Sequence, residues 1–145
     1  MTKFVHKLSQ KEKPRISKNK KVFSVAVLLV EIMHADHVLR GREESTVTRI
    51  LCDKFGLAEE DAVELFAKVN HLMKHAISLQ KYTALLNSSM NYQEKIGLIN
   101  ALWCVAYSDN MLDLYEEHLI RRVSDLLYIS HSDFIKQKFQ VNDSI

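Results

Sequence analysis

The scarcity of turn-forming residues is the feature that most limits what this chain can fold into. Its 145 residues include three glycines and one proline. A protein made of many short strands needs a tight turn between each pair, and glycine and proline supply much of that turn chemistry. A few long helices need far fewer turns. The composition therefore predicts an all-α protein, and the length is sufficient for one compact domain with its own core.

Hydrophobic periodicity divides the chain into about seven helices and gives no convincing strand. The first segment, Val22 to Asp36, is apolar nearly all round, which is typical of a central helix packed on several sides. Asn91 with Glu94, and Asp113 with Glu116, have the spacing of a capping box at a helix start. The predicted helical segments are 22–36, 42–55, 57–79, 81–87, 95–109, 117–127 and 132–138.

The net charge of +2 hides an uneven distribution. Residues 1–21 contain eight Lys or Arg and one acid, whereas residues 22–145 contain 12 Lys or Arg and 17 acids. With Pro14 inside the basic segment, we expect a flexible N-terminal arm at 1–21 and a helical domain at 22–145. The arm is either a solvated tail or a weak contact with a membrane surface or a partner groove. It has no interleaved aromatics, so we expect no specific nucleic-acid partner.

The two cysteines and the apolar runs bear on the compartment. Cys52 and Cys104 lie in apolar helical patterns rather than in a CxxC array, which favours core thiols in a reducing environment. The longest apolar run, VAVLLVEIM, is short and contains Glu31, and the N-terminus lacks the apolar core of a secretory signal. We therefore expect a soluble, cytoplasmic protein.

An acidic pattern occurs twice in the chain. A shift of 73 residues aligns DHVLRGREE, residues 36–44, with DNMLDLYEE, residues 109–117. We call these segments the first joint and the second joint. Apolar matches alone would be common, but coincident acids are harder to obtain by chance. The pattern predicts that the domain contains two pseudo-repeated units, each a helix, an acidic joint and a second helix.

The first glutamate of each joint is expected to point inward. Glu116 precedes Ile120 and Val123 by four and seven residues and so shares their buried side, whereas Glu117 lies nearer the boundary; Glu43 stands in the same relation to the next helix. A buried carboxylate needs a partner. Three kinds of partner are possible: the N–H groups at the helix start, a neighbouring arginine, or a hard divalent cation. The nearby arginines are Arg40, Arg42, Arg49, Arg121 and Arg122.

The cation hypothesis names six ligands and favours Ca²⁺, Mg²⁺ or Mn²⁺ over Zn²⁺, because hard cations prefer oxygen. His34 and His37 flank the first joint's aspartate, but Tyr107 and Asn110 replace them in the second, which argues against a repeated zinc site. The candidate metal ligands are Asp36, Glu43, Glu44, Asp109, Glu116 and Glu117.

Three further polar residues have ordinary explanations. Glu31 lies on the apolar helix, where a structural ion pair is the preferred interpretation. His71 and His75 stand four apart, a spacing that can bind zinc, but they fall opposite the apolar stripe and fit a solvated surface.

Glycine-rich phosphate loops, GxSxG and HExxH are absent from the sequence, so we expect no enzyme.

The segments LLVEIMHAD, REESTVTRILCDKFGL and EKIGLINALWCVAYSDNMLDLYEEHLIRRVSDLLYIS resemble the TerB-like family associated with bacterial tellurite resistance, and most of all an uncharacterised bacterial branch of it. The resemblance runs from about residue 22 to residue 138. The family's acidic signature, Ala-Asp-Gly followed by Glu-Glu, is matched in both joints, except that His37 and Asn110 stand where glycine is usual.

The resemblance implies an all-helical, non-enzymatic domain that binds or senses a divalent metal as an adaptor in a stress response. The alternative is a structural protein–protein interaction module, in which the acids only cap helices and form salt bridges. The candidate partner is a protein, which would bind through the joints in the first case and through the basic arm or an apolar groove in the second.

Overall fold

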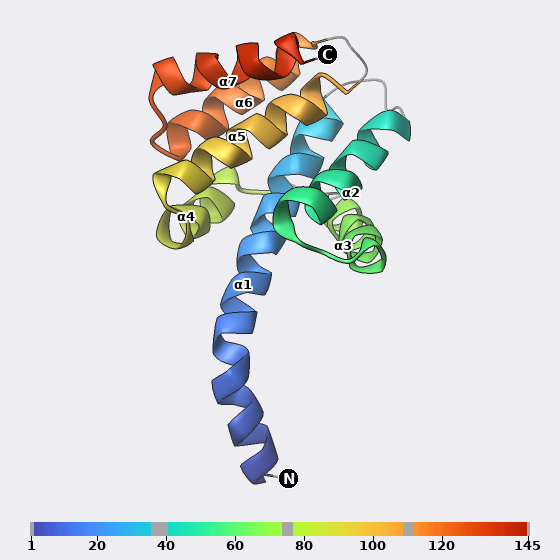
Figure 1. Ribbon diagram of the computed structural model, residues 1–145, viewed down its shortest axis with the longest axis vertical. Coiled ribbons are helices and arrows are strands. Elements are labelled where there is room, and N and C mark those ends of the chain that lie inside the picture. The colour runs from blue at the N-terminus through green and yellow to red at the C-terminus, as the bar shows by residue number, and fades with distance from the viewer. Residues whose placement is uncertain (1, 36–40, 74–76, 109–111, 145) are drawn as a thin grey trace.

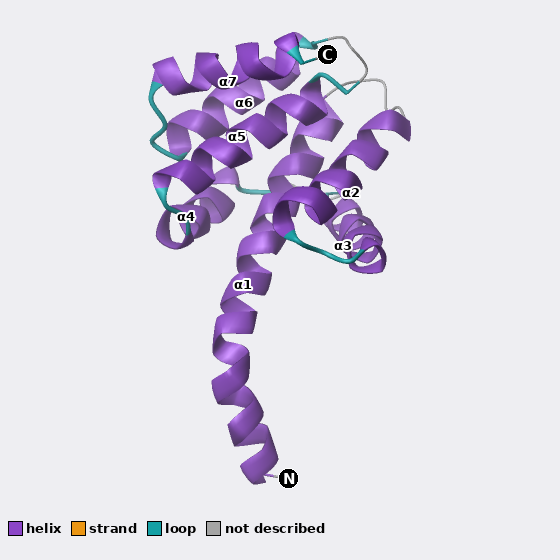
Figure 2. Cartoon of the chain, viewed as in Figure 1, coloured by secondary structure: helices purple, strands orange, loops and turns teal. Residues whose placement is uncertain are grey.

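The structure, a computed structural model, describes residues 2–35, 41–73, 77–108 and 112–144; the side chains of residues 2–18 and 41–43 are outside this description. Within these ranges the chain forms seven helices and no strand (Figure 2). This confirms the all-α prediction. The helices are α1 (Thr2–Ala35), α2 (Gly41–Phe55), α3 (Glu59–Leu72), α4 (Leu79–Ser89), α5 (Tyr92–Ala106), α6 (Leu114–Leu126) and α7 (His131–Asp143).

Helix α1 is the centre of the fold. Its residues Val25 to Val30 are fully buried on every side of the helix, as are Ile32 and Met33. The helix contacts α2, α3, α4, α5 and α6. In Figure 1 its C-terminal half rises through the body, with α2 and α3 on one side and α4 to α7 on the other. The all-round apolar pattern of this segment therefore reflects packing on several sides, as predicted.

The N-terminal half of α1 differs from the expected arm. Residues 2–21 continue the helix, and its first turns extend away from the body (Figure 1). Pro14 lies inside this helix although proline removes one backbone hydrogen bond there. The segment is thus helical in the structure, while its flexibility in solution stays a prediction. Among the described residues, no helix combines the length and apolar character needed to cross a bilayer.

Helix α5 is the second buried element and links the two sides of the body. It contacts α1, α2, α6 and α7. Trp103 is fully buried, and its ring centroid lies 5.3 Å from that of Phe134 on α7. This aromatic pair connects the last helix to the core. Helix α7 extends to Asp143, beyond the predicted end at 138, because Val141 is also buried.

The helix ends follow local chemistry. The predicted capping boxes Asn91–Glu94 and Asp113–Glu116 are both present, which confirms them as helix starts. Gly56 ends α2 with a φ of 73°, a left-handed conformation that glycine adopts without strain. The predicted segment 57–79 is shorter in the structure, where α3 covers 59–72. Helix α4 starts after Ser78, whose hydroxyl accepts a hydrogen bond from the N–H of Lys81 at 3.4 Å.

Both joints connect helices at the predicted positions, α1 to α2 and α5 to α6. Residues 36–40 and 109–111, however, lie outside the described ranges. The pseudo-repeat of two equivalent units therefore stays a prediction.

Candidate functional site

The first joint contributes one described side chain to the predicted metal site. Asp36 lies outside the described residues, and so does the side chain of Glu43, whose backbone belongs to α2. Glu44 is exposed on the first turn of α2. An exposed carboxylate at a helix N-terminus is stabilised by the helix dipole and by water, so this residue needs no metal to satisfy it.

The second joint is held by a capping box. The carboxylate of Asp113 accepts a hydrogen bond from the N–H of Tyr115 at 2.7 Å. Glu116 Oε1 accepts one in return from the N–H of Asp113 at 3.3 Å. The Glu116 side chain is fully buried, as its spacing predicts. Glu116 therefore satisfies a backbone donor that would otherwise be unpaired at the start of α6.

Glu117 forms an ion pair with a residue that sequence reasoning did not find. Lys138 Nζ on α7 lies 2.5 Å from Glu117 Oε1, and the two side chains are 24% and 19% exposed. Lys138 Nζ also lies 5.6 Å from the centroid of the Trp103 ring. Arg121, one of the expected partners, instead has its guanidinium 5.6 Å from the Phe134 ring centroid. Lys138 fixes α7 to the start of α6.

Lys138 could be identified as the partner of Glu117 only from the way α7 packs back toward the start of α6. That return brings the end of one helix beside the start of the other, but no local spacing encodes it. The nearby arginines were the natural expectation, because sequence neighbours meet at i+4 whatever the fold.

The described carboxylates do not by themselves make a cation site. Within the described ranges, no three His, Cys, Asp or Glu side chains lie close enough together to hold a metal ion. Glu116 is used as a helix cap and Glu117 as an ion-pair partner. A hard cation needs several oxygen ligands at once. The other three predicted ligands, Asp36, Asp109 and the Glu43 side chain, lie outside the described residues.

Glu31 is a half-buried acid on α1. Burial raises the pKa of Glu31 above its ordinary value, and the charge of His34, one turn further on, partly opposes that rise. His34 Nε2 lies 2.6 Å from Asn70 Oδ1 on α3. The structural ion pair expected for Glu31 stays a prediction. Of the predicted histidine pair, His71 is exposed and His75 lies outside the described residues.

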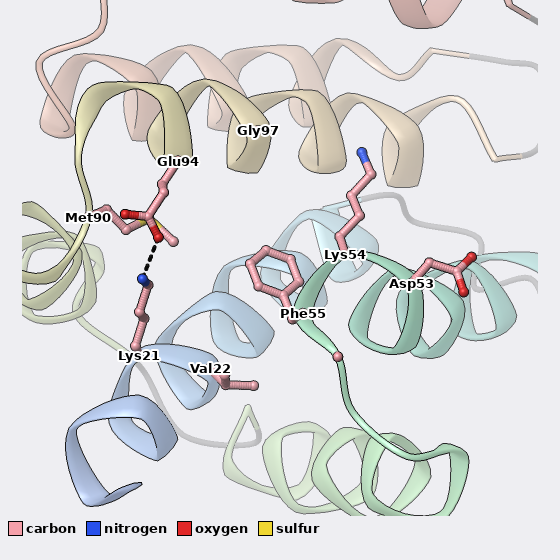
Figure 3. A pocket seen from close by; sticks show the side chains of 9 residues that line it. Lys21, Val22, Asp53, Lys54, Phe55, Met90, Glu94 and Gly97 are labelled. Atoms are coloured by element: carbon pink, nitrogen blue, oxygen red, sulfur yellow. Dashed lines mark hydrogen bonds and ion pairs between the residues drawn. The ribbon is translucent and has the colours of Figure 1, made fainter. Parts of the chain in front are cut away.

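An open pocket of about 580 Å³ lies where α1, α2 and α5 meet (Figure 3). Lys21 Nζ lies 2.5 Å from Glu94 Oε2 at one side of it. Glu94 also accepts a hydrogen bond from the N–H of Asn91 at 3.1 Å. The contact with Lys21 and this hydrogen bond both lower the pKa of Glu94. Sequence reasoning missed the pocket because its lining comes from residues 21 to 97 and follows no motif. Gly97, inside an otherwise helical pattern, was the one local signal.

A comparison with known protein families gives a match for this chain. The family model described as "Tellurite resistance protein TerB" matches residues 23–138. No curated protein and no solved structure gives a match. The matched range contains helices α2 to α6 entire, the packed half of α1 and much of α7, and it ends at Lys138, the partner of Glu117. Because that range covers most of the chain, the chain belongs to the TerB family.

Proposed function

We propose that this TerB-family chain is a non-enzymatic adaptor that binds a protein partner, and that the acids of the second joint stabilise its fold. The supporting observation is that both described glutamates of that joint already have structural partners. Glu116 is fully buried and caps α6, and Glu117 pairs with Lys138. A general acid or base must come within reach of its substrate, which a fully buried carboxylate does not.

The start of α6 is the surface that best supports partner binding. Leu114 is 72% exposed and Tyr115 63% exposed, next to each other on the first turn. The capping box fixes the backbone of this turn, so two large side chains are presented in a defined geometry. Tyrosine is enriched among residues that dominate binding energy, and fixing their geometry lowers the entropy cost of association.

Differential capture followed by direct binding tests the adaptor function. The protein and its Leu114→Ser/Tyr115→Ser and Phe139→Ser variants would be used to purify partners from the native cells. Phe139 is 56% exposed on α7 and serves as the matched control. We expect one protein that binds the wild type and Phe139→Ser saturably in purified form, and binds the α6 variant at least about tenfold more weakly. Equal binding by all three would refute this surface.

A divalent cation at the joints is the second candidate function. It is favoured by the repeated spacing of aspartate and paired glutamates, and by the position of Glu116 and Glu117 directly after the segment that contains Asp109. Carboxylate oxygens are the ligands preferred by Ca²⁺, Mg²⁺ and Mn²⁺. Zn²⁺ is the less favoured ion, because the histidines of the first joint have no counterpart in the second.

Titration calorimetry separates the two candidates. Ca²⁺, Mg²⁺, Mn²⁺ and Zn²⁺ would be added to the chelator-treated protein and to Asp109→Asn. If the acids are structural, no ion gives heat and the chelator leaves the melting temperature unchanged. Saturable heat that is lost in Asp109→Asn, together with a higher melting temperature in the presence of the ion, would establish the cation site instead.

A further inference from the structure

We propose that the pocket between α1, α2 and α5 binds a small amphiphilic anion, a linear aliphatic carboxylate. This site is separate from the joints and does not rest on the adaptor function. Its volume of about 580 Å³ falls within the range of small-molecule sites, roughly 300 to 1,000 Å³. Three features support the inference: a glycine in the helix that lines the pocket, an apolar lining, and one lysine that has no ion-pair partner in the described part of the chain.

One wall of the pocket is formed by Gly97, in the interior of α5. Glycine is among the least favourable residues in a helix interior. Gly97 is nevertheless exposed, and a Cβ added there would meet no heavy atom within 4 Å. The packing of the fold therefore does not require glycine at this position. Because Gly97 has no side chain, space stays open in the wall of the pocket between Glu94 and Lys54 (Figure 3).

The apolar lining comes from three elements. Val22 lies on α1, and Phe55 is the last residue of α2. Met90 is the residue that caps the end of α4. Val22 and Phe55 are half-buried, so part of each remains open to the pocket, and Met90 is nearly covered. In Figure 3 the Phe55 ring faces the space bounded by Lys21, Val22 and Met90. An aliphatic chain lying on this surface would remove apolar area from water.

The pocket lining contains two lysines and two acids, but within the described ranges only Lys21 of these lysines has an acid within ion-pair distance. Lys21 and Glu94 neutralise each other at 2.5 Å. Lys54 Nζ donates to Asn100 Oδ1, a neutral amide, at 2.7 Å, and no ion pair of Lys54 occurs among the described residues. Asp53 also lines the pocket, but its side chain is directed away from Lys54 (Figure 3). The free N–H groups of Lys54 therefore favour an anionic head group, with its chain directed across Phe55.

The chain carries its own reporters for a direct test. Of its three glycines, Gly56 and Gly97 line the pocket, whereas Gly41 begins α2 and lies at the opposite end of that helix from Phe55. In ¹H–¹⁵N correlation spectra of the labelled protein titrated with octanoate, we expect saturable shifts of the Gly56 and Gly97 amides and none of Gly41. Acetate, which lacks the chain, and octanol, which lacks the charge, should each bind at least about tenfold more weakly.

Variants make the proposal refutable. Gly97→Leu should fill the pocket and abolish the octanoate shift of Gly56 without lowering the melting temperature, because a Cβ there meets no heavy atom within 4 Å and leucine favours a helix interior. Lys54→Gln should weaken octanoate about tenfold. Gln140→Leu, an exposed position on α7, is the control and should bind as the wild type does. Unchanged binding in Gly97→Leu, equal shifts of all three glycines, or equal affinity for octanol and octanoate would overturn the proposal.

Discussion

Phe134 is the side chain through which α7 enters the core. It is 1% exposed, and its ring centroid lies 5.3 Å from that of Trp103 and 5.9 Å from that of His131. The guanidinium of Arg121 lies 5.6 Å from the same ring. Phe134→Ala removes these contacts together and leaves a cavity between α5 and α7.

The expected loss follows from burial and cavity formation. Replacing a buried phenylalanine by alanine costs about 3 to 5 kcal/mol, and the close packing on Trp103 places Phe134 near the middle of that range. We expect the free energy of unfolding to fall by about 4 kcal/mol. For a chain of 145 residues this corresponds to a decrease of about 13 °C in melting temperature.

Urea unfolding and calorimetry would measure this change, with Phe139→Ala as the matched control on the same helix. Phe139 is 56% exposed, so its truncation should change the free energy of unfolding by no more than about 0.5 kcal/mol. A loss below about 1.5 kcal/mol for Phe134→Ala, or equal losses for both variants, would refute the packing of α7 described above.

Four other predictions follow from the described contacts. In a double-mutant cycle, Glu117→Gln and Lys138→Met should show a coupling of about 1 kcal/mol, because the pair is mostly but not wholly buried; zero coupling would contradict it. Tyr128 has a φ of 59°, so Tyr128→Gly should raise the free energy of unfolding by about 0.5 kcal/mol in urea denaturation, since relief of strain exceeds the added unfolded-state entropy. Hydrogen bonds from Tyr92 and Ser130 lower the pKa of Asp133, so their stabilisation is present above about pH 4 and is lost as pH falls through the folded-state pKa; the stability difference between wild type and Tyr92→Phe should therefore shrink from pH 7 to pH 2. Residues 2–21 carry a large positive charge, so cosedimentation should detect binding to anionic but not to neutral vesicles, and high salt should abolish it.

The sequence by itself determined the parts of this protein that depend on near neighbours. Low glycine and proline content predicts helices, and all-round apolarity of Val25 to Val30 predicts a central one. The capping boxes at Asn91 and Asp113 each involve two residues three positions apart, so their chemistry is complete within one helical turn. The inward direction of Glu116 follows from the same helical geometry.

Tertiary structure decided which distant groups meet. Glu117 pairs with Lys138 because α7 returns to the start of α6, and no spacing rule singles out that lysine among the cations of the chain. Lys21, Phe55 and Gly97 form one pocket because α2 and α5 both pack on α1. Such contacts depend on how helices are oriented relative to one another, which a single helix's periodicity does not encode. The joints were therefore visible in the sequence as acids, whereas the partners of those acids and the pocket emerged only from the packed helices.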